Sequence, residues 1–257
     1  MESKSHIDND LSDSELLRYS RQIMLPQFGF EAQKKLLGSR VLLIGIGGLG
    51  SISSMYLVAA GVGHIVISDD DVVEITNLQR QIIYNTDEIN QKKVQVAKNR
   101  LQKINPNIQI SIFDQKLEGE LLSQEVSLAD IVIDGTDNYK SRFEINKQCV
   151  MSKTALVSAA TIRFEGQLTV FNVTDNSPCY SCLYQDTMDE SQTCAENGVL
   201  SAVPGVFGSL QAVEAIKFLA EVGNVLDGEL LIVDNLMNEF RKIKLKKDMD
   251  CLVCGQK

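Results

Sequence analysis

The sequence contains little histidine. Among its 257 residues, the only two are His6, in the polar N-terminal stretch, and His64, at the start of an expected strand. Histidine is the usual general acid or base of hydrolase triads and serves many dehydrogenases. Because neither position suits that role, the composition argues against histidine-dependent hydrolases and dehydrogenases.

Positive charge is also in short supply. The chain has 25 Lys and Arg residues against 34 Asp and Glu, a formal net charge of -9 at pH 7. Nucleic acids and anionic membranes attract basic surfaces, so we expect neither as a partner. The one basic cluster, RKIKLKK at 241–247, alternates in the way of an edge strand with a solvated face, and we interpret it as structural.

Long apolar runs and a signal peptide are missing from the sequence. No stretch approaches the length of uninterrupted apolar residues that crosses a bilayer, and residues 1–15 are polar and acidic. We therefore expect a cytoplasmic protein, with a disordered tail at 1–10 followed by a single domain at 11–257. In a reducing compartment its six cysteines suit metal or thiol chemistry better than disulfides.

Apolar strands alternate with helices through the first 160 residues. The expected strands are 41–44, 64–69, 108–113, 130–135 and 155–159, and helices follow at 51 onward, 87–104, 119–126 and 139–150. Two helices precede them, the first opened by a capping box of Ser12 and Glu15. This alternation predicts an α/β, Rossmann-like fold with a mainly parallel sheet and helices on both faces. Strands at 166–173 and 229–235, around an apolar helix at 205–221, extend the sheet.

A glycine-rich turn follows the first strand. The stretch VLLIGIGGLGS at 41–51 contains Gly45, Gly47, Gly48 and Gly50. Without a Cβ the backbone turns sharply and approaches a phosphate, and the next helix supplies free N–H groups. The following strand ends in three aspartates, and Asp69 has the position of a ribose-binding carboxylate. This pattern predicts nucleotide binding without distinguishing ATP from NAD.

Further polar residues suit a triphosphate. Candidate ligands are Asn77, Arg80, Lys93, Asp137 and Asn138. The two last residues follow a strand's carboxyl end, where open α/β sheets bind ligands, and a carboxylate there suits a Mg²⁺ that bridges phosphates. The alternative for Lys93 is a solvated surface lysine, since Lys92 is adjacent. The pyrophosphate of NAD carries fewer charges than a triphosphate, so an NAD enzyme has less need of such a cluster of ligands.

The cysteines form two CxxC pairs and two single residues. Cys179 and Cys182, with Cys251 and Cys254, predict a structural four-thiolate Zn²⁺ site. A thioredoxin-like redox pair would leave the second CxxC unexplained. Cys149 lies in an apolar helix and is expected in the core, whereas the acidic loop at 184–198 carries Cys194. An accidental exposed thiol and a reactive nucleophile are equally compatible with Cys194.

A series of motifs occurs in unbroken order from about Leu16 onward. They are RYSRQI, GIGGLG, DDDVVEITNLQRQ, KKVQVA, DGTDN, EGQLTVF, CYSC, TCAENGV, GSLQAVEAIK and CLVCGQ. In this the chain resembles the ThiF/MoeB/HesA adenylyltransferases, prokaryotic relatives of the ubiquitin-activating enzymes. The resemblance implies adenylation, with ATP and Mg²⁺, of the C-terminal glycine of a ubiquitin-like sulfur-carrier protein. It also implies a homodimer with one zinc per subunit.

The resemblance also assigns expected roles to residues. Asp69 resembles the ribose ligand, and Asp137 is similar to the family's Mg²⁺-linked catalytic aspartate. The residues similar to the family's triphosphate contacts are Asn77, Arg80 and Lys93. Arg21 resembles an arginine finger delivered from the other subunit, and Cys194 resembles a cysteine that forms a thioester or persulfide with the carrier. Residues 38–160 would then form a nucleotide-binding half and 161–257 a carrier-binding and zinc half.

The carrier and the sulfur source remain open at this stage. SDDDVV and NLQRQI favour ThiF and hence the carrier ThiS, whereas RFEGQLTVF favours MoeB and hence MoaD. Since no sulfurtransferase domain follows Cys254, we expect a separate donor of the cysteine desulfurase or rhodanese type. The alternative functions are an NAD(P)-dependent Rossmann oxidoreductase and a non-catalytic nucleotide-bound scaffold. An already ionised carrier carboxylate needs no general base, which agrees with the scarcity of histidine.

Overall fold

The computed structural model describes residues 11–184 and 198–255. The predicted disordered tail at 1–10 and most of the acidic loop, with Cys194, lie outside the described residues. Helix α1 (Asp13–Ile23) opens with the predicted capping box, in which Ser12 and Glu15 exchange hydrogen bonds. The sequence therefore defined this helix start correctly, because a capping box is a purely local arrangement.

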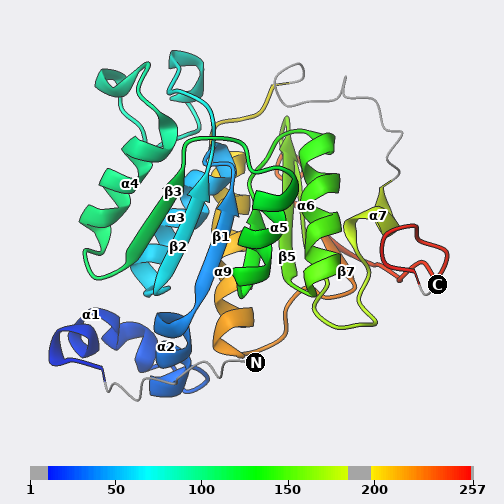
Figure 1. Ribbon diagram of the computed structural model, residues 1–257, viewed down its shortest axis with the longest axis horizontal. Helices are drawn as coiled ribbons and strands as arrows, with labels where there is room; N and C mark the ends of the chain where they lie inside the picture. The colour runs from blue at the N-terminus through cyan, green and yellow to red at the C-terminus, as the bar shows by residue number, and fades with distance from the viewer. Residues whose placement is uncertain (1–10, 185–197, 256–257) are drawn as a thin grey trace.

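One mixed sheet forms the centre of the molecule (Figure 1). In spatial order its strands are β3 (Gln109–Phe113), β2 (His64–Ser68), β1 (Arg40–Ile44), β4 (Ile131–Asp134), β5 (Ala155–Ile162), β6 (Glu165–Phe171), β7 (Glu229–Asp234) and β8 (Glu239–Lys244). Neighbours from β3 to β5 are parallel, and those from β5 to β8 are antiparallel. This confirms the predicted α/β, Rossmann-like class with its extension by further strands. As expected of the basic cluster, β8 is an exposed edge strand.

Helices cover both faces of the sheet. Behind it in Figure 1 lie α3 (Gly48–Ala60) and α9 (Ala202–Ala220), in front α5 (Gly119–Leu128) and α6 (Tyr139–Ser152), and at the left α4 (Lys93–Ile104). The other helical segments in the described part of the chain are α2 (Gly29–Gly38), η1 (Ile75–Asn77), η2 (Thr86–Glu88) and α7 (Tyr180–Leu183). Because strand side chains alternate, Val41 and Leu43 pack in the core with α3, α4 and α9, while Leu42 and Ile44 pack with α5 and α6.

The helix predicted over 87–104 begins only at Lys93. Asn90 has a left-handed φ of 70°, and Lys92 is extended and bridges to Val72. The N–H of Asn90 donates to the carbonyl of Val73, and the N–H of Val73 donates to that of Gln91. Residues 89–92 therefore separate η2 from α4, and the prediction of one continuous helix over 87–104 was wrong.

Helix α9 is long and apolar enough to cross a membrane by composition alone, with half of its apolar window buried. The helix is not an uninterrupted apolar run, because Gln211, Glu214 and Lys217 lie within it. In the fold α9 packs against α3, β5 and β6. It also carries the buried Gln211, whose side chain donates to the carbonyl of Asp134 at 2.8 Å. These contacts are those of a core helix.

Candidate nucleotide-binding site

A cavity of about 330 Å³ lies at the carboxyl ends of the parallel strands. It opens between the turns that follow β1 and β4, where the strand order passes from 3-2-1 to 4-5. Neighbouring connections diverge at such a switch point, which leaves a crevice for a ligand. At its base Gly45 meets Gly135: a Cβ on Gly45 would lie 2.8 Å from the Gly135 carbonyl group. The sequence pattern had predicted this edge of the sheet.

The four glycines of the turn have different tasks. Gly45 has a φ of 88°, which favours glycine, and a Cβ on Gly50 would lie 2.0 Å from the Gly45 carbonyl oxygen. Gly45, Gly47 and Gly48 line the cavity, whereas Gly50 is absent from its wall as far as the described residues form it. Since α3 already begins at Gly48, the N–H groups of its first turn lack partners within the helix and are suited to an anion.

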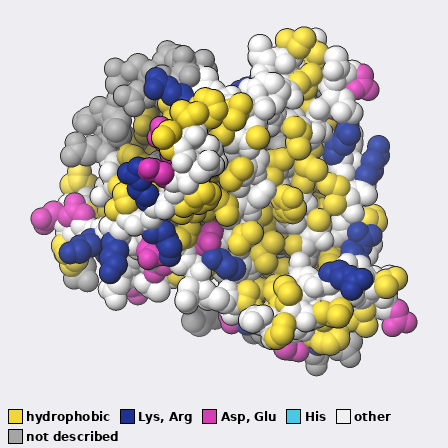
Figure 2. Space-filling model, turned by 180° about the vertical axis from the view of Figure 1, so that it is seen from behind, with side chains coloured by type: hydrophobic (Ala, Val, Ile, Leu, Met, Phe, Trp, Pro, Cys, Tyr) yellow, Lys and Arg dark blue, Asp and Glu magenta, His cyan; other side chains and the backbone are white. Residues whose placement is uncertain are grey.

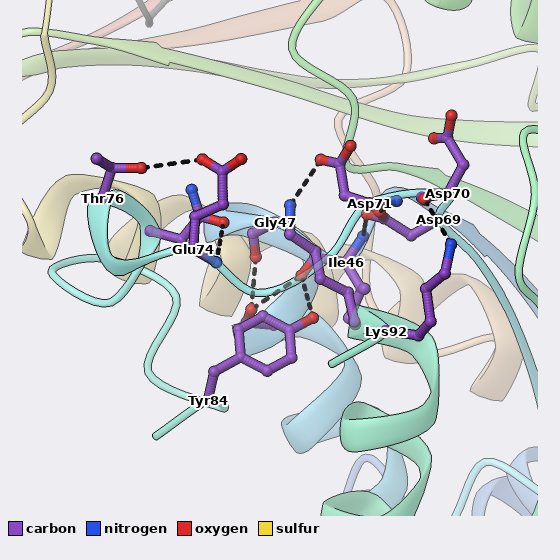
Figure 3. A network of polar contacts seen from close by, with 12 residues as sticks. Ile46, Gly47, Asp69, Asp70, Asp71, Glu74, Thr76, Tyr84 and Lys92 are labelled. Atoms are coloured by element: carbon purple, nitrogen blue, oxygen red, sulfur yellow. Dashed lines mark hydrogen bonds and ion pairs between the residues drawn. The ribbon is translucent and has the colours of Figure 1, made fainter. Parts of the chain in front are cut away.

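Asp69 is tied to the glycine turn (Figure 3). Its carboxylate accepts hydrogen bonds from the N–H of Ile46 at 2.8 Å and from that of Asp71 at 2.9 Å. The Ile46 carbonyl accepts in turn from the Tyr84 hydroxyl at 2.9 Å. Burial raises the pKa of Asp69 above its usual value, although Lys93 and these N–H groups act in the opposite direction. The structure thus places Asp69 in the cavity wall, beside the turn.

Lys93 and Arg80 bring positive charge to the cavity. The Lys93 side chain is only 5% exposed and its Nζ lies 2.7 Å from a carboxylate oxygen of Asp71, whereas the Lys92 side chain is 48% exposed. Lys93 is therefore a wall residue and the solvated lysine is Lys92, a distinction that the sequence left open. Arg80 lines the cavity too, and its guanidinium donates to the Thr76 carbonyl at 3.0 Å.

Asn77 is not among the described residues that line the cavity. Its side-chain oxygen accepts from the N–H of Glu74 at 3.3 Å, and its carbonyl accepts from the N–H groups of Arg80 and Gln81. Asn77 thus braces the turn that carries Arg80. The neighbouring Gln81 does line the cavity and was missed by the sequence analysis.

The turn after β4 carries Asp137, which is exposed and lines the cavity. Asn138 lines it as well and caps α6, its side chain accepting from the N–H of Ser141 at 2.9 Å. Carboxylate and amide oxygens are the ligands that Mg²⁺ prefers, so this turn suits that ion. Two neighbours, the buried Asp134 and Arg142, were not singled out from the sequence. The only available signal for Asp134 was an acid that closes an otherwise apolar strand.

Another part of the cavity wall is apolar, and the sequence did not predict its residues. Leu117, Leu122 and Ile145 line the cavity and belong to the core on the α5 and α6 side of the sheet. Lys116 lies at the same rim, where its ammonium group is 2.8 Å from the carboxylate of Glu118. Isolated apolar residues of this kind carry no motif, because they come from the segment before α5, from α5 and from α6 and meet only in the folded protein.

Arg21 lies far from the cavity of its own chain. Helix α1 is at the end of the molecule opposite the carboxyl ends of the parallel strands (Figure 1). There the Tyr19 hydroxyl accepts from the side-chain amide of Asn105 at 2.8 Å, which fixes α1 beside the C-terminal end of α4. The structure does not bring Arg21 to the other predicted residues, and a role for it requires a second subunit.

The four predicted zinc ligands do come together, although the two pairs are 72 residues apart. Neighbouring Sγ atoms lie 3.8 Å (Cys179–Cys251), 3.9 Å (Cys182–Cys179) and 3.4 Å (Cys182–Cys254) apart. A tetrahedron with zinc–sulfur bonds of about 2.3 Å has edges of about 3.8 Å, so the cluster fits Zn²⁺. The N–H of Asp248 donates to Cys182 Sγ at 3.4 Å, as a supporting contact. Cys149 is buried in the core, as expected.

Comparisons with known proteins agree with this architecture. Residues 19–253 match the ThiF family. The chain is 44% identical over 247 residues to the molybdopterin-synthase adenylyltransferase of Escherichia coli, covering 96% of this chain and 99% of the relative. It is 43% identical over 245 residues to the sulfur carrier protein ThiS adenylyltransferase of E. coli, covering 95% and 97%.

Solved structures share the fold at lower identity. The structure of E. coli MccB with ATP superposes with a TM-score of 0.81 at 24% identity, covering 98% of this chain and 75% of that chain. The structure of PaaA gives a TM-score of 0.80 at 19% identity, covering 96% and 79%. The sequence matches cover almost the whole chain and confirm the resemblance inferred from the motifs: the chain belongs to the ThiF family.

Proposed function

We propose that the chain is an ATP-dependent adenylyltransferase that activates the C-terminal glycine of a ubiquitin-like sulfur carrier of the ThiS or MoaD type. This activation would serve sulfur transfer in thiamine or molybdopterin biosynthesis. Relatives more than 40% identical over nearly the whole chain are named for these two reactions. The observation that carries the proposal is a single cavity lined by the glycine turn, by Arg80 and Lys93, and by Asp137.

The cavity suggests a place for each part of the nucleotide. The phosphates lie against the first turn of α3, with Lys93 and Arg80 as their cations. Asp69 faces the ribose, and the base lies against the apolar wall of Leu117, Leu122 and Ile145. This division suits ATP better than NAD, because Arg80 and Lys93 line the cavity together with the glycine turn, and a triphosphate carries more charge to neutralise than the pyrophosphate of NAD.

The reaction needs positioning and charge neutralisation only. An oxygen of the carrier's terminal carboxylate forms a bond to the α-phosphorus while the bond to the bridging oxygen of the β-phosphate breaks, and pyrophosphate leaves with the electron pair. Arg80 and Lys93 neutralise the charge on the phosphates, and Asp137 with Asn138 would hold the Mg²⁺. When bound, that ion supplies additional positive charge to the leaving pyrophosphate.

A homodimer is supported by the exposed half of α9. Two valines of this mostly apolar helix, Val206 and Val213, are 40% and 48% exposed, and Tyr56 of α3 is 56% exposed. Apolar side chains spread over the face of the molecule seen from behind, with Lys and Arg at its margins (Figure 2). A second subunit that covers this face would remove it from water, and would deliver Arg21 to the neighbouring cavity.

The remaining assignments concern the cysteines and the source of sulfur. The four-cysteine cluster holds a structural Zn²⁺, since four thiolates leave no open position. Sulfur comes from a separate cytoplasmic donor of the cysteine desulfurase or rhodanese type, and Cys194 takes part in sulfur transfer rather than adenylation. A Cys194→Ala protein should then keep its pyrophosphate exchange rate, and a loss of exchange would contradict this role.

The test of the adenylyltransferase is exchange of labelled pyrophosphate into ATP with purified ThiS or MoaD. We expect exchange that depends on one carrier and falls at least a hundredfold in Arg80→Ala and Asp137→Ala. Arg100→Ala and Asp175→Ala, which lie outside the cavity wall, are the matched controls. Equal rates in all four variants would refute the assigned site.

Two outcomes would support the alternative functions. Stabilisation by NAD in thermal shift, with none by Mg·ATP, would favour the oxidoreductase. Carrier binding without any exchange would favour the nucleotide-bound scaffold.

A further inference from the structure

A buried ion pair lies at the wall of the cavity. Asp134, the last residue of β4, has a side chain 1% exposed, and the side chain of Arg142 on α6 is 10% exposed. The Arg142 Nε lies 3.7 Å from an Asp134 carboxylate oxygen. Such a pair contributes little to stability compared with apolar residues of the same size, because both charges lose their hydration. Its presence beside a proposed active site therefore points to a purpose other than stability.

Both members of the pair form hydrogen bonds to the short turn at 135–137. The Asp134 carboxylate accepts from the Thr136 N–H at 2.9 Å and from the Thr136 hydroxyl at 2.6 Å. Arg142 donates from Nη2 to the Thr136 carbonyl at 2.7 Å. All three polar groups of Thr136 are thus bonded to the pair. The next residue is Asp137, so the position of this turn determines where the Asp137 carboxylate lies in the cavity.

The same turn touches the glycine turn. A Cβ on Gly135 would lie 2.5 Å from the Gly45 carbonyl oxygen, so the two backbones are in close contact. Below the turn, Asn138 and Arg142 are one helical turn apart on α6, and both line the cavity. The separation between the phosphate-binding glycines and Asp137 is therefore set by how firmly the turn at 135–137 is held.

We propose that Arg142, with Asp134 as its buried counter-ion, is a positioning residue that holds Asp137 in register with the phosphates at the glycine turn. The proposal rests on the adenylyltransferase function proposed above. Loss of the pair would leave the glycine turn, Arg80 and Lys93 intact. ATP would still bind, but Asp137 and its Mg²⁺ would no longer be held at the reacting phosphate, so the turnover number falls and the Mg²⁺ requirement rises.

The experiment compares two double variants. Arg142→Gln alone leaves a buried carboxylate unpaired and risks misfolding, so Asp134→Asn is combined with it. The control is Arg40→Gln with Glu125→Gln, because that ion pair is also largely buried but Arg40 begins β1, at the end opposite the cavity. In carrier-dependent pyrophosphate exchange we expect the Asp134/Arg142 variant to lose at least tenfold in kcat. Its KM for ATP should stay within threefold, and the control should keep both values.

Further readouts separate positioning from other roles. The Mg²⁺ concentration for half-maximal exchange should rise at least fivefold in the Asp134/Arg142 variant, and Arg142→Lys, which keeps a positive charge beside Asp134, should retain more of the wild-type rate than that variant. An unchanged kcat would overturn the proposal, and so would an equal loss in the control. A large rise in KM for ATP at constant kcat would also overturn it, because that result indicates direct contact with the nucleotide.

One measurement needs no turnover. In thermal shift, Mg²⁺ should add to the stabilisation of the wild type by ATP and should add little in the Asp134/Arg142 variant. An equal Mg²⁺ increment in both proteins would contradict the positioning role. If the wild type shows no exchange with either carrier, the proposed function fails, while this shift still tests whether the pair positions Asp137.

Discussion

Replacement of Gly50 by alanine tests the geometry of the glycine turn most directly. The added Cβ would lie 2.0 Å from the Gly45 carbonyl oxygen, whereas real Cβ contacts below 3.0 Å are essentially never found. The start of α3 and the end of β1 must therefore separate by about 1 Å. Because both atoms belong to the backbone or are attached directly to it, no side-chain rotation relieves this contact.

The expected magnitude follows from two opposing effects. Overpacking of this kind costs about 1–3 kcal/mol, and the upper end applies because backbone must move. Alanine in place of glycine in a helix returns about 1 kcal/mol. A net loss of about 2 kcal/mol corresponds to a decrease of roughly 4–8 °C in melting temperature for a domain of this size. A shift of the first turn of α3 by about 1 Å also misplaces the N–H groups for phosphate, so we expect at least a tenfold weaker Kd for Mg·ATP.

The assay is thermal unfolding together with calorimetric titration of Mg·ATP. The matched control is Gly205→Ala in α9, where a Cβ would meet nothing within 4 Å and helix propensity alone should stabilise the protein. If Gly50→Ala melted as high as Gly205→Ala and bound Mg·ATP as tightly as the wild type, the close contact between Gly50 and the Gly45 carbonyl would be refuted.

Three other perturbations have defined outcomes. Lys93→Ala should weaken Mg·ATP binding at least tenfold by titration and Lys92→Ala less than twofold, because only Lys93 is buried in the cavity wall; equal effects would contradict this difference. Removal of Zn²⁺ by a chelator under reducing conditions should lower the melting temperature by roughly 10 °C or more, while a protein without metal that melts normally would disprove a structural ion. Burial raises the pKa of Asp69, so the folded state holds this proton more tightly than the unfolded state, and stability falls as the pH rises from about 4 through the folded pKa. Asp69→Asn removes this titration, and urea unfolding should show the variant gaining stability relative to the wild type over that range; a difference that does not vary with pH would exclude the effect.

Local patterns in the sequence were sufficient for the strands, the first helix and the family. The capping box of α1, the glycine turn after β1 and the two CxxC pairs depend on neighbouring residues and appear where predicted. The helix at 87–104 was predicted too long because Asn90 and Gln91 bond to Val73, which lies 17 and 18 positions earlier in the chain. Periodicity alone does not detect such a partner.

Only the tertiary structure determines which of the candidate residues line the cavity. Lys92 and Lys93 are indistinguishable as neighbours in the sequence, yet the start of α4 buries one and exposes the other. Asn77 belongs to a motif whose other residues line the cavity, but its own side-chain oxygen accepts a hydrogen bond from Glu74 in the same turn. The buried pair of Asp134 and Arg142 depends on the packing of α6 against β4.

The amino-acid sequence by itself determined the elements, the glycine turn and the four thiols, because each follows from steric and hydrogen-bonding preferences over a few residues. Only the tertiary structure decided which of the charged residues share the cavity. Their meeting depends on the strand order and on the helix crossovers, which bring together turns that lie about 90 residues apart, those after β1 and β4. Burial then gives a residue such as Lys93 an environment that its neighbours in sequence do not share.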